Sequence, residues 1–293
     1  MKAKVMFTLL LMGSIFFLCQ EVEARECYVV NNNGICISSE EYNNLTNLGF
    51  FDFEIMNMDE DIYNSNKDLV ANGKTTKTTY VKDTYYHVGN RVYTTSREVS
   101  EEEYNKILPV CEKSVGVRGV SSGYTETTGK RLDNTIIELS NNLRYKVTLR
   151  WKIMPVTRSY DIIGIGLDDE KVYASGNRTF SQTYCVTAMT CSSSSTADIK
   201  NQITGVGASF KLPSGSYVFM SSYLYYDVSK QPGVGTITNT ESYGDYAHAT
   251  SNVTQGQARD NYAVGYGGIN LYSNIESYYD YMSKATAYWS GSW

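Results

Sequence analysis

Residues 143 to 153 form the pattern that most constrains how this chain can fold. Apolar side chains alternate here with basic or hydroxyl-bearing ones: Leu143, Tyr145, Val147, Leu149, Trp151 and Ile153 against Arg144, Lys146, Thr148, Arg150 and Lys152. A helix would scatter such residues around its circumference, whereas a strand places alternate residues on opposite faces. The pattern therefore predicts a long antiparallel strand with its apolar face in a core and its basic face in solvent.

The chain on either side of this strand predicts the fold class. From residue 135 to the end, short runs of strand-forming residues are separated by turns of Gly, Ser, Asn and Asp, while the 293 residues include only 4 prolines. The amphipathic helices that a doubly wound fold would need are missing from the pattern. We therefore predict a mainly β protein, with an antiparallel β-sandwich or barrel-like domain over residues 135–293.

A small α+β portion is predicted over residues 25–113. Two short helices are indicated by serines that stand three positions before a glutamate, which is the spacing of a capping box: Ser38 with Glu41, and Ser100 with Glu103. The segment between these helices is typical of a hairpin that turns at Gly89 and Asn90. Residues 114–134 are rich in Gly, Ser and Thr and are predicted to be a linker or irregular strands.

The first 24 residues have the pattern of a secretory signal peptide. Lys2 and Lys4 precede an apolar run from Val5 to Cys19, and cleavage is expected after Ala24. The apolar run is shorter than the roughly 20 residues of a membrane-spanning helix, and no later run is apolar enough to be one. The sequence predicts a secreted, extracellular protein with no transmembrane segment in its mature chain, either free or held noncovalently at the cell surface.

The cysteines fit an oxidising compartment. Cleavage of the signal removes Cys19 and leaves five cysteines. Four of these form two pairs that flank short turns, Cys27 with Cys36 and Cys185 with Cys191. We predict a disulfide within each pair, which leaves Cys111 without a partner unless one of the two pairings is wrong. No C-x-x-C spacing or histidine pair accompanies these cysteines, so neither a metal site nor a cofactor is predicted.

Charge and aromatic content bear on the kind of partner. The formal net charge of −5 gives no basic field for a phosphate backbone, so nucleic acid is not an expected partner. The 26 tyrosines can either line exposed faces of sheets or form a stacking surface for glycans or proteins. The residues predicted to bind a ligand on such a surface are Tyr223, Tyr225, Tyr226, Trp289 and Trp293.

Known catalytic and ion-binding patterns were not found. His87 and His248 have no carboxylate or cysteine at ligand spacing and are predicted to be surface or packed residues. The acidic run that begins at Asp59 lacks the glycine and the terminal glutamate of an EF-hand loop. The sequence offers no catalytic residue.

Residues 151–166 contain four consecutive polar residues between two apolar runs: Arg158, Ser159, Tyr160 and Asp161. Pro155 cannot donate to a central ladder, so the strand from Leu143 is expected to end or bend near it, and a second strand to begin near Tyr160. Arg158 and Asp161 then fall at the joint between the two strands. We predict that they fix this corner through an ion pair or through carboxylate bonds to turn amides.

Three phrases of the sequence resemble a group of uncharacterised exported proteins of low-GC Gram-positive bacteria. They are "NGICISSEEYNNL", "LRWKIMPVTRSYDIIGIG" and "GVGASFKLPSG". The bias toward Asn, Lys, Ile and Tyr is also typical of AT-rich bacterial coding sequences. The resemblance implies secretion and β architecture, and it carries over no catalytic or binding residue.

Three functions are consistent with these features. The first is a non-enzymatic adhesion or ligand-binding module at the cell envelope or outside it, whose partner is a glycan, a cell-wall polymer or a surface protein. The second is an exported glycan or cell-wall hydrolase, indicated by the compartment and the abundant carboxylates. The third is a membrane-inserting β toxin, indicated by long amphipathic strands and segments rich in Ser, Thr and Tyr.

Overall fold

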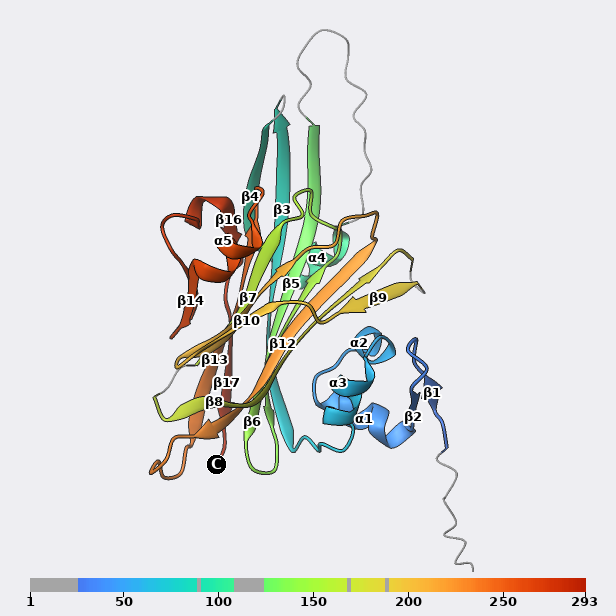
Figure 1. The fold of residues 1–293 in the computed structure, drawn as a ribbon, viewed down its shortest axis with the longest axis vertical. Helices are drawn as coiled ribbons and strands as arrows, with labels where there is room; N and C mark the ends of the chain where they lie inside the picture. Colours follow the sequence, from blue (N-terminus) through green and yellow to red (C-terminus); the bar gives the residue numbers. More distant parts are fainter. Residues whose placement is uncertain (1–25, 89–90, 108–123, 168–169, 188–189) are drawn as a thin grey trace, which may run out of the picture.

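The computed structural model describes residues 26–88, 91–107, 124–167, 170–187 and 190–293 (Figure 1). The predicted signal peptide, the predicted turn at Gly89 and Asn90, and Cys111 lie outside the described residues. In the described part, two large antiparallel sheets dominate the chain, as the mainly β prediction required. They pack face to face and do not close into a barrel, so the sandwich is the arrangement that the chain adopts.

The larger sheet has seven strands in the order β4-β3-β5-β6-β12-β8-β9. Their bounds are β3 Gly73–Val88, β4 Arg91–Val99, β5 Tyr124–Glu138, β6 Leu143–Trp151, β8 Val172–Cys185, β9 Cys191–Ser194 and β12 Phe219–Lys230. Strands β3 and β5 have 16 and 15 residues, about three times the usual strand length of 5–6. In Figure 1 the ends of β3, β4 and β5 project beyond the rest of the sandwich.

The second sheet has six strands. Its path is β10-β11-β7-β13-β16, and β17 also pairs with β13. The bounds are β7 Tyr160–Leu167, β10 Asp198–Gln202, β11 Gly205–Lys211, β13 Asn239–Ala249, β16 Tyr279–Tyr281 and β17 Ala285–Ser290.

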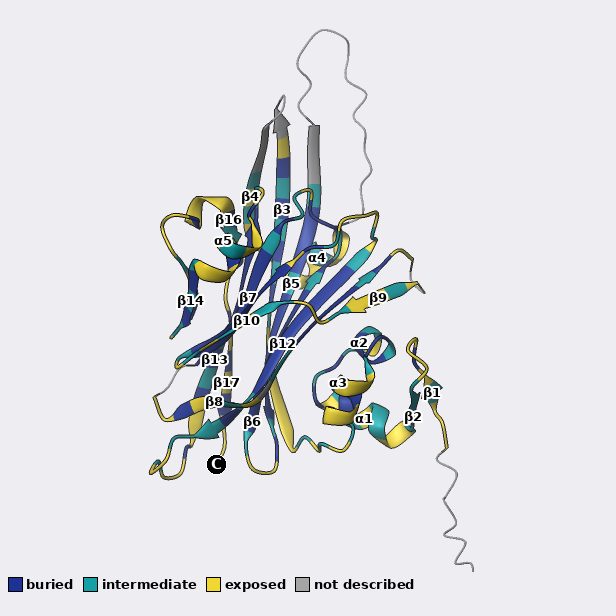
Figure 2. Cartoon of the chain, in the orientation of Figure 1, coloured by how far each residue is buried: buried dark blue, intermediate teal, exposed yellow. Residues whose placement is uncertain are grey.

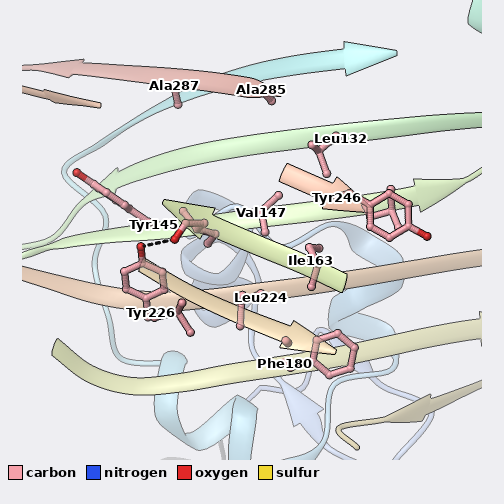
Figure 3. Packing of buried hydrophobic residues seen from close by; sticks show 14 of the residues in the cluster. Leu132, Tyr145, Val147, Ile163, Phe180, Leu224, Tyr226, Tyr246, Ala285 and Ala287 are labelled. Carbon is pink, nitrogen blue, oxygen red and sulfur yellow. Dashed lines mark hydrogen bonds between the residues drawn. The ribbon is translucent and has the colours of Figure 1, made fainter. Parts of the chain in front are cut away.

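The interior of the sandwich is apolar over most of its length. Figure 3 shows side chains of the seven-stranded sheet (Leu132, Val147, Leu224 and Phe180) facing those of the six-stranded sheet (Ile163, Ala285 and Ala287). Tyr226, fully buried among them, donates its hydroxyl to the carbonyl of Ile165 at 3.1 Å, so its polar tip is satisfied.

The basic face of β6 is not in solvent, which corrects the prediction. Figure 2 colours almost all of β6 as buried, and Arg144 and Lys146 are only 4% and 2% exposed. An N-terminal helical unit covers this face; it consists of β1 Val29–Val30, β2 Cys36–Ile37, α1 Ser39–Asn47, α2 Asp52–Met56 and α3 Glu60–Asn66. Lys146 forms an ion pair with Glu54 of α2 at 2.6 Å, and Arg144 pairs with Asp227 at 2.7 Å. Period two correctly predicts a strand, but it cannot show what covers the second face.

The structure also confirms several local predictions. Ser38 caps α1 in a capping box with Glu41, and Ser100 caps α4 (Glu101–Lys106) through the amide of Glu103. The disulfides Cys27–Cys36 and Cys185–Cys191 are both formed. Each pair lies where the chain reverses over a few residues, which brings the Cβ atoms within bridging distance.

The predicted domain boundaries differ from those of the fold. Strands β3 and β4, placed by sequence in the N-terminal portion, belong to the same sheet as β6: β4 pairs with β3, and β3 pairs with β5. Residues 124–134, predicted as a linker or irregular strands, are regular strand within β5 and pair with β3 from Lys77 to His87. Their Thr and Gly content resembles a linker, but they pair with β3 along the whole stretch, and with β6 from Lys130 onward, which fixes them as strand.

A C-terminal segment covers the outer face of the six-stranded sheet. It comprises α5 Gln255–Asp260, β14 Tyr262–Gly265, β15 Gly268–Leu271 and the 3-10 turn η1 Glu276–Tyr278. The β14–β15 hairpin lies so close to β7 that a Cβ on Gly166 would stand 2.4 Å from the carbonyl oxygen of Gly265, which only glycine permits. No helix in the described part of the chain is long and apolar enough to cross a membrane.

Candidate functional site

A crevice opens where the chain crosses from one sheet to the other. Strand β9 ends the seven-stranded sheet, β10 begins the six-stranded sheet, and residues 195–197 join them. The crevice has a volume of about 380 Å³, within the usual size range of small-ligand sites. Its lining combines two tyrosine rings with hydroxyl, amide and charged side chains: Tyr160, Tyr184, Gln182, Ser194, Thr196, Asp198, Ser209, Lys211, Ser214 and Gln255, beside Ala197, Phe210, Leu212 and Pro213. We refer to it as the crossover crevice.

Strand register brings the polar residues of the crevice together. Ser209 of β11 is paired with Asp198 of β10, and Lys211 is paired with Tyr160 of β7. Paired residues in antiparallel strands share a face of the sheet, so the four side chains lie on one face. The disulfide Cys185–Cys191 joins the paired ends of β8 and β9, next to Tyr184 on the opposite wall.

Two buried hydroxyls in this region have no hydrogen-bond partner. Ser209 is 1% exposed and Tyr262 is fully buried, yet neither Ser209 Oγ nor Tyr262 Oη finds a partner among the described residues. Burial, with a smaller contribution from the charge of Asp198, raises the pKa of the Tyr262 hydroxyl well above its ordinary value. An unsatisfied buried hydroxyl costs about 1–3 kcal/mol, which a ligand group entering the crevice could recover.

The crevice carries one charge of each sign. Asp198 accepts a hydrogen bond from the Gln255 amide at 2.9 Å, so part of its carboxylate is already engaged. Lys211 is exposed, lies 6.0 Å from the centre of the Tyr160 ring, and has no ion pair within the described residues. Lys211 is thus free to meet a ligand.

A second pocket, of about 750 Å³, lies between α2 and the disulfide-linked ends of β8 and β9. Its walls are mostly apolar and include Phe53 and Phe219, whose rings lie 4.9 Å apart. The amide of Asn57 already donates to the carbonyl of Phe53 and accepts from Asn32. The polar side chains in its lining are Asn32, Asp52, Asn57 and Thr187, so this pocket offers a ligand fewer polar contacts than the crossover crevice.

The predicted aromatic binding surface does not exist in the structure. Tyr223, Tyr225, Tyr226 and Trp289 are between 0% and 4% exposed, and Trp293 is partly buried against the core of the sandwich. Tyr223 and Tyr225 lie under the helical unit, where both rings contact Phe50 edge-on. These tyrosines alternate along β12 as a surface pattern would, but both faces of the sheet are covered, so they serve packing.

Arg158 and Asp161 lie at the predicted joint but do not pair with each other. Arg158 donates to the carbonyls of Pro155, Pro213 and Gly215. Asp161, fully buried, accepts from the Ala249 amide at 2.9 Å and from the Tyr246 hydroxyl, and it contacts His248. The residues thus hold two different parts of the corner.

His248 and Asp161 form a dyad inside the protein. Nδ1 of His248 lies 3.0 Å from a carboxylate oxygen of Asp161, an arrangement that could orient an imidazole for catalysis. However, neither side chain has any exposed surface, and the His248 ring packs edge-on against Trp151 at 5.0 Å. In this conformation no substrate can reach the dyad. As predicted, His248 is a packed residue; the side chain of His87 lies outside the described ones.

Sequence reasoning missed the crossover crevice because its residues are scattered over the chain. Ser209, Lys211 and Asp198 stand in ordinary strand segments, and only the pairing of β10 with β11 brings them together. A period-two pattern predicts the strands, but it does not predict their partners. No group of His, Cys, Asp and Glu within the described residues could hold a metal ion. No protein-family model matches the chain, and a search of curated proteins finds no similar sequence.

Proposed function

We propose that this protein is an extracellular, non-enzymatic ligand-binding module whose ligand, a glycan, occupies the crossover crevice. The observation that carries the proposal is the buried and unsatisfied hydroxyl of Ser209 in the lining of the crevice. Folding alone gives no reason to keep a hydroxyl there, since an alanine would avoid the cost of leaving it unpaired. Ser209 Oγ has almost no accessible surface in this conformation, so a hydroxyl-rich ligand would supply the missing partner when the Ser209 side chain turns toward the crevice that it lines.

The remaining lining fits the same class of ligand. The faces of Tyr160 and Tyr184 can contact the C–H face of a sugar ring, and the remaining acceptor capacity of the Asp198 carboxylate can bind its hydroxyls. Secretion, predicted from the N-terminal sequence, and two disulfides are consistent with a ligand met outside the cell.

The test is to screen the mature protein on an array of glycans and cell-wall polymers and then to compare variants with a ligand found there. Ser209→Ala should weaken binding roughly tenfold, the effect of one lost hydrogen bond. The same change should leave the melting temperature equal or raise it, because it removes an unsatisfied group. Ser192→Ala, at an exposed position of β9 outside the crevice lining, is the matched control.

Two outcomes would contradict the proposal. If Ser209→Ala lowered the melting temperature and left affinity unchanged, the hydroxyl would have a structural role. If ligands bound the array but Tyr184→Ala and Ser209→Ala both bound like the wild type, the site would lie elsewhere.

Membrane insertion is a second candidate function, favoured by the long ribbon of β3, β4 and β5. A tilted strand crosses a bilayer with about 9–11 residues, and nine residue pairs join β3 to β4 from Tyr80–Val99 to Val88–Arg91. Both faces of this hairpin carry charge near its base, with Lys82 opposite Arg97 and Asp83 opposite Ser96. Dye-loaded vesicles that stay intact over a range of pH and lipid composition would remove this candidate.

A further inference from the structure

The charge distribution of the crossover crevice narrows the class of its ligand. Lys211 and Asp198 are the charged residues of its lining, and they are not equivalent. Asp198 holds the Gln255 amide at 2.9 Å, and its remaining acceptor capacity suits sugar hydroxyls. Lys211 instead presents an exposed ammonium group that no described carboxylate neutralises.

Lys211 lies beside the residues proposed to bind the sugar ring. Lys211 is two residues from Ser209 on the same strand, so both side chains lie on one face of β11, and Tyr160 is its cross-strand partner. A sugar ring against Tyr160 with a hydroxyl at Ser209 would therefore place a ring substituent near the ammonium group. A carboxylate is the substituent that gains most there, because a charge-assisted hydrogen bond is about twice as strong as a neutral one.

Resting on the proposed function, we infer that the crevice takes an acidic sugar, whose carboxylate pairs with Lys211 while its hydroxyls bind Ser209 and Asp198. Among uronic and sialic acids the shared chemistry is a carboxylate on a pyranose ring. The inference is a preference between ligands, so it can fail while the crevice still binds glycans.

Two matched pairs of probes test this preference. The first pair is trigalacturonic acid and its methyl ester, and the second is sialyllactose and lactose. Titration calorimetry at low salt should show that the wild-type protein binds the acidic member of at least one pair roughly three- to tenfold more tightly than the neutral member. The difference in affinity should shrink as the salt concentration rises, because Lys211 is exposed.

Variants separate the ammonium group from the rest of the crevice. Lys211→Gln should remove the preference, because it weakens the acidic member more than the neutral one, and Lys211→Arg should keep the preference. Lys77→Gln, at an exposed position of β3, removes one positive charge far from the crevice in sequence and outside its lining, and should bind like the wild type. Ser209→Ala should weaken both members of a pair equally.

The outcomes distinguish this inference from the function on which it rests. Equal binding of acidic and neutral members would overturn the acidic-sugar inference and leave a glycan site standing. A preference for the acid that survives Lys211→Gln, or failure of the wild type to bind either acid, would also overturn it. If, in addition, no glycan on the array binds the protein, the proposed function fails together with the acidic-sugar inference.

Discussion

The two faces of β6 are buried equally but by opposite chemistry. Toward the six-stranded sheet, Tyr145, Val147 and Leu149 are fully buried among apolar side chains. On the other face, under the helical unit, Arg144 and Lys146 are almost as buried. Arg144 pairs with Asp227, and Lys146 pairs with Glu54. Burying charge is costly unless each charge has a partner, so Arg144 and Lys146 each depend on one carboxylate within an otherwise apolar contact, whereas the first face is buried by apolar side chains alone.

The difference between the faces shows in the environment of the Lys146–Glu54 pair. Burial raises the pKa of Glu54 and lowers that of Lys146, and the 2.6 Å ion pair opposes both shifts. Lys146 also donates to the carbonyl of Gly49 and lies 4.1 Å from the centre of the Phe50 ring. A single cation therefore holds three groups of the helical unit on the sheet.

Removing one member of this pair should have the largest effect. Lys146→Ala leaves the Glu54 carboxylate buried without a cation, and we expect a loss of about 3–5 kcal/mol in the free energy of unfolding. Urea denaturation followed by tyrosine fluorescence measures it. The double variant Glu54→Leu with Lys146→Met should recover most of the loss, since an apolar pair of similar volume replaces the ions. A loss below about 1 kcal/mol for the single variant would show that the carboxylate finds water or protonates instead.

Truncation on the apolar face should cost somewhat less. Leu149→Ala removes a fully buried side chain from the interior of the sandwich, and we expect a loss of about 2–5 kcal/mol that depends on how far the cavity collapses. Unlike Lys146→Ala, this loss should be almost independent of pH between 5 and 9, because no ionisable group changes its partner. The same denaturation series at several pH values checks it, and a strongly pH-dependent loss would contradict the contrast between the faces.

The contrast also explains how much of the fold could be read from the sequence. Local signals were sufficient for the capping serines, Ser38 and Ser100, and for both disulfides, because each depends on residues within nine positions. The alternation of residues 143–153 gave the strand over 143–151 correctly. Alternation does not show which element covers each face of the sheet. For this reason the sequence predicts that Lys146 and Tyr223 are exposed.

The candidate site was beyond local signals for a related reason. Ser209 is one of many serines in a strand, and what sets it apart is a missing hydrogen-bond partner, a property of the folded protein. Its neighbours Tyr184 and Gln255 come from distant parts of the chain. By contrast, the clustering of tyrosines in β12 was visible in the sequence but reflected packing on both faces of a covered sheet.

Asp245 provides the most specific test of how this protein buries charge. Like Glu54 it is buried, but its partners are the amides of Tyr246 and Ile269, at 2.8 and 2.9 Å, and no ion pair forms with it in the described residues. Burial is the main cause that raises the pKa of Asp245 from 3.8 to about 7, and the two amides oppose it. A buried carboxyl that forms no ion pair thus favours its neutral form.

The raised pKa of Asp245 predicts a pH dependence of stability with a definite sign. Because the folded pKa lies above the unfolded one, the stabilisation is fully present below about pH 4 and is lost as pH rises to about 7, with a slope of at most ~1.4 kcal/mol per pH unit. Asp245→Asn, which stays neutral, should flatten the stability profile between pH 4 and 7. Asp260→Asn is the control, since Asp260 is exposed and its hydrogen bond with Arg259 lowers its pKa, which gives the opposite sign. An unchanged slope in Asp245→Asn would mean that Asp245 remains ionised in the folded protein, held by its two amides as Glu54 is held by Lys146.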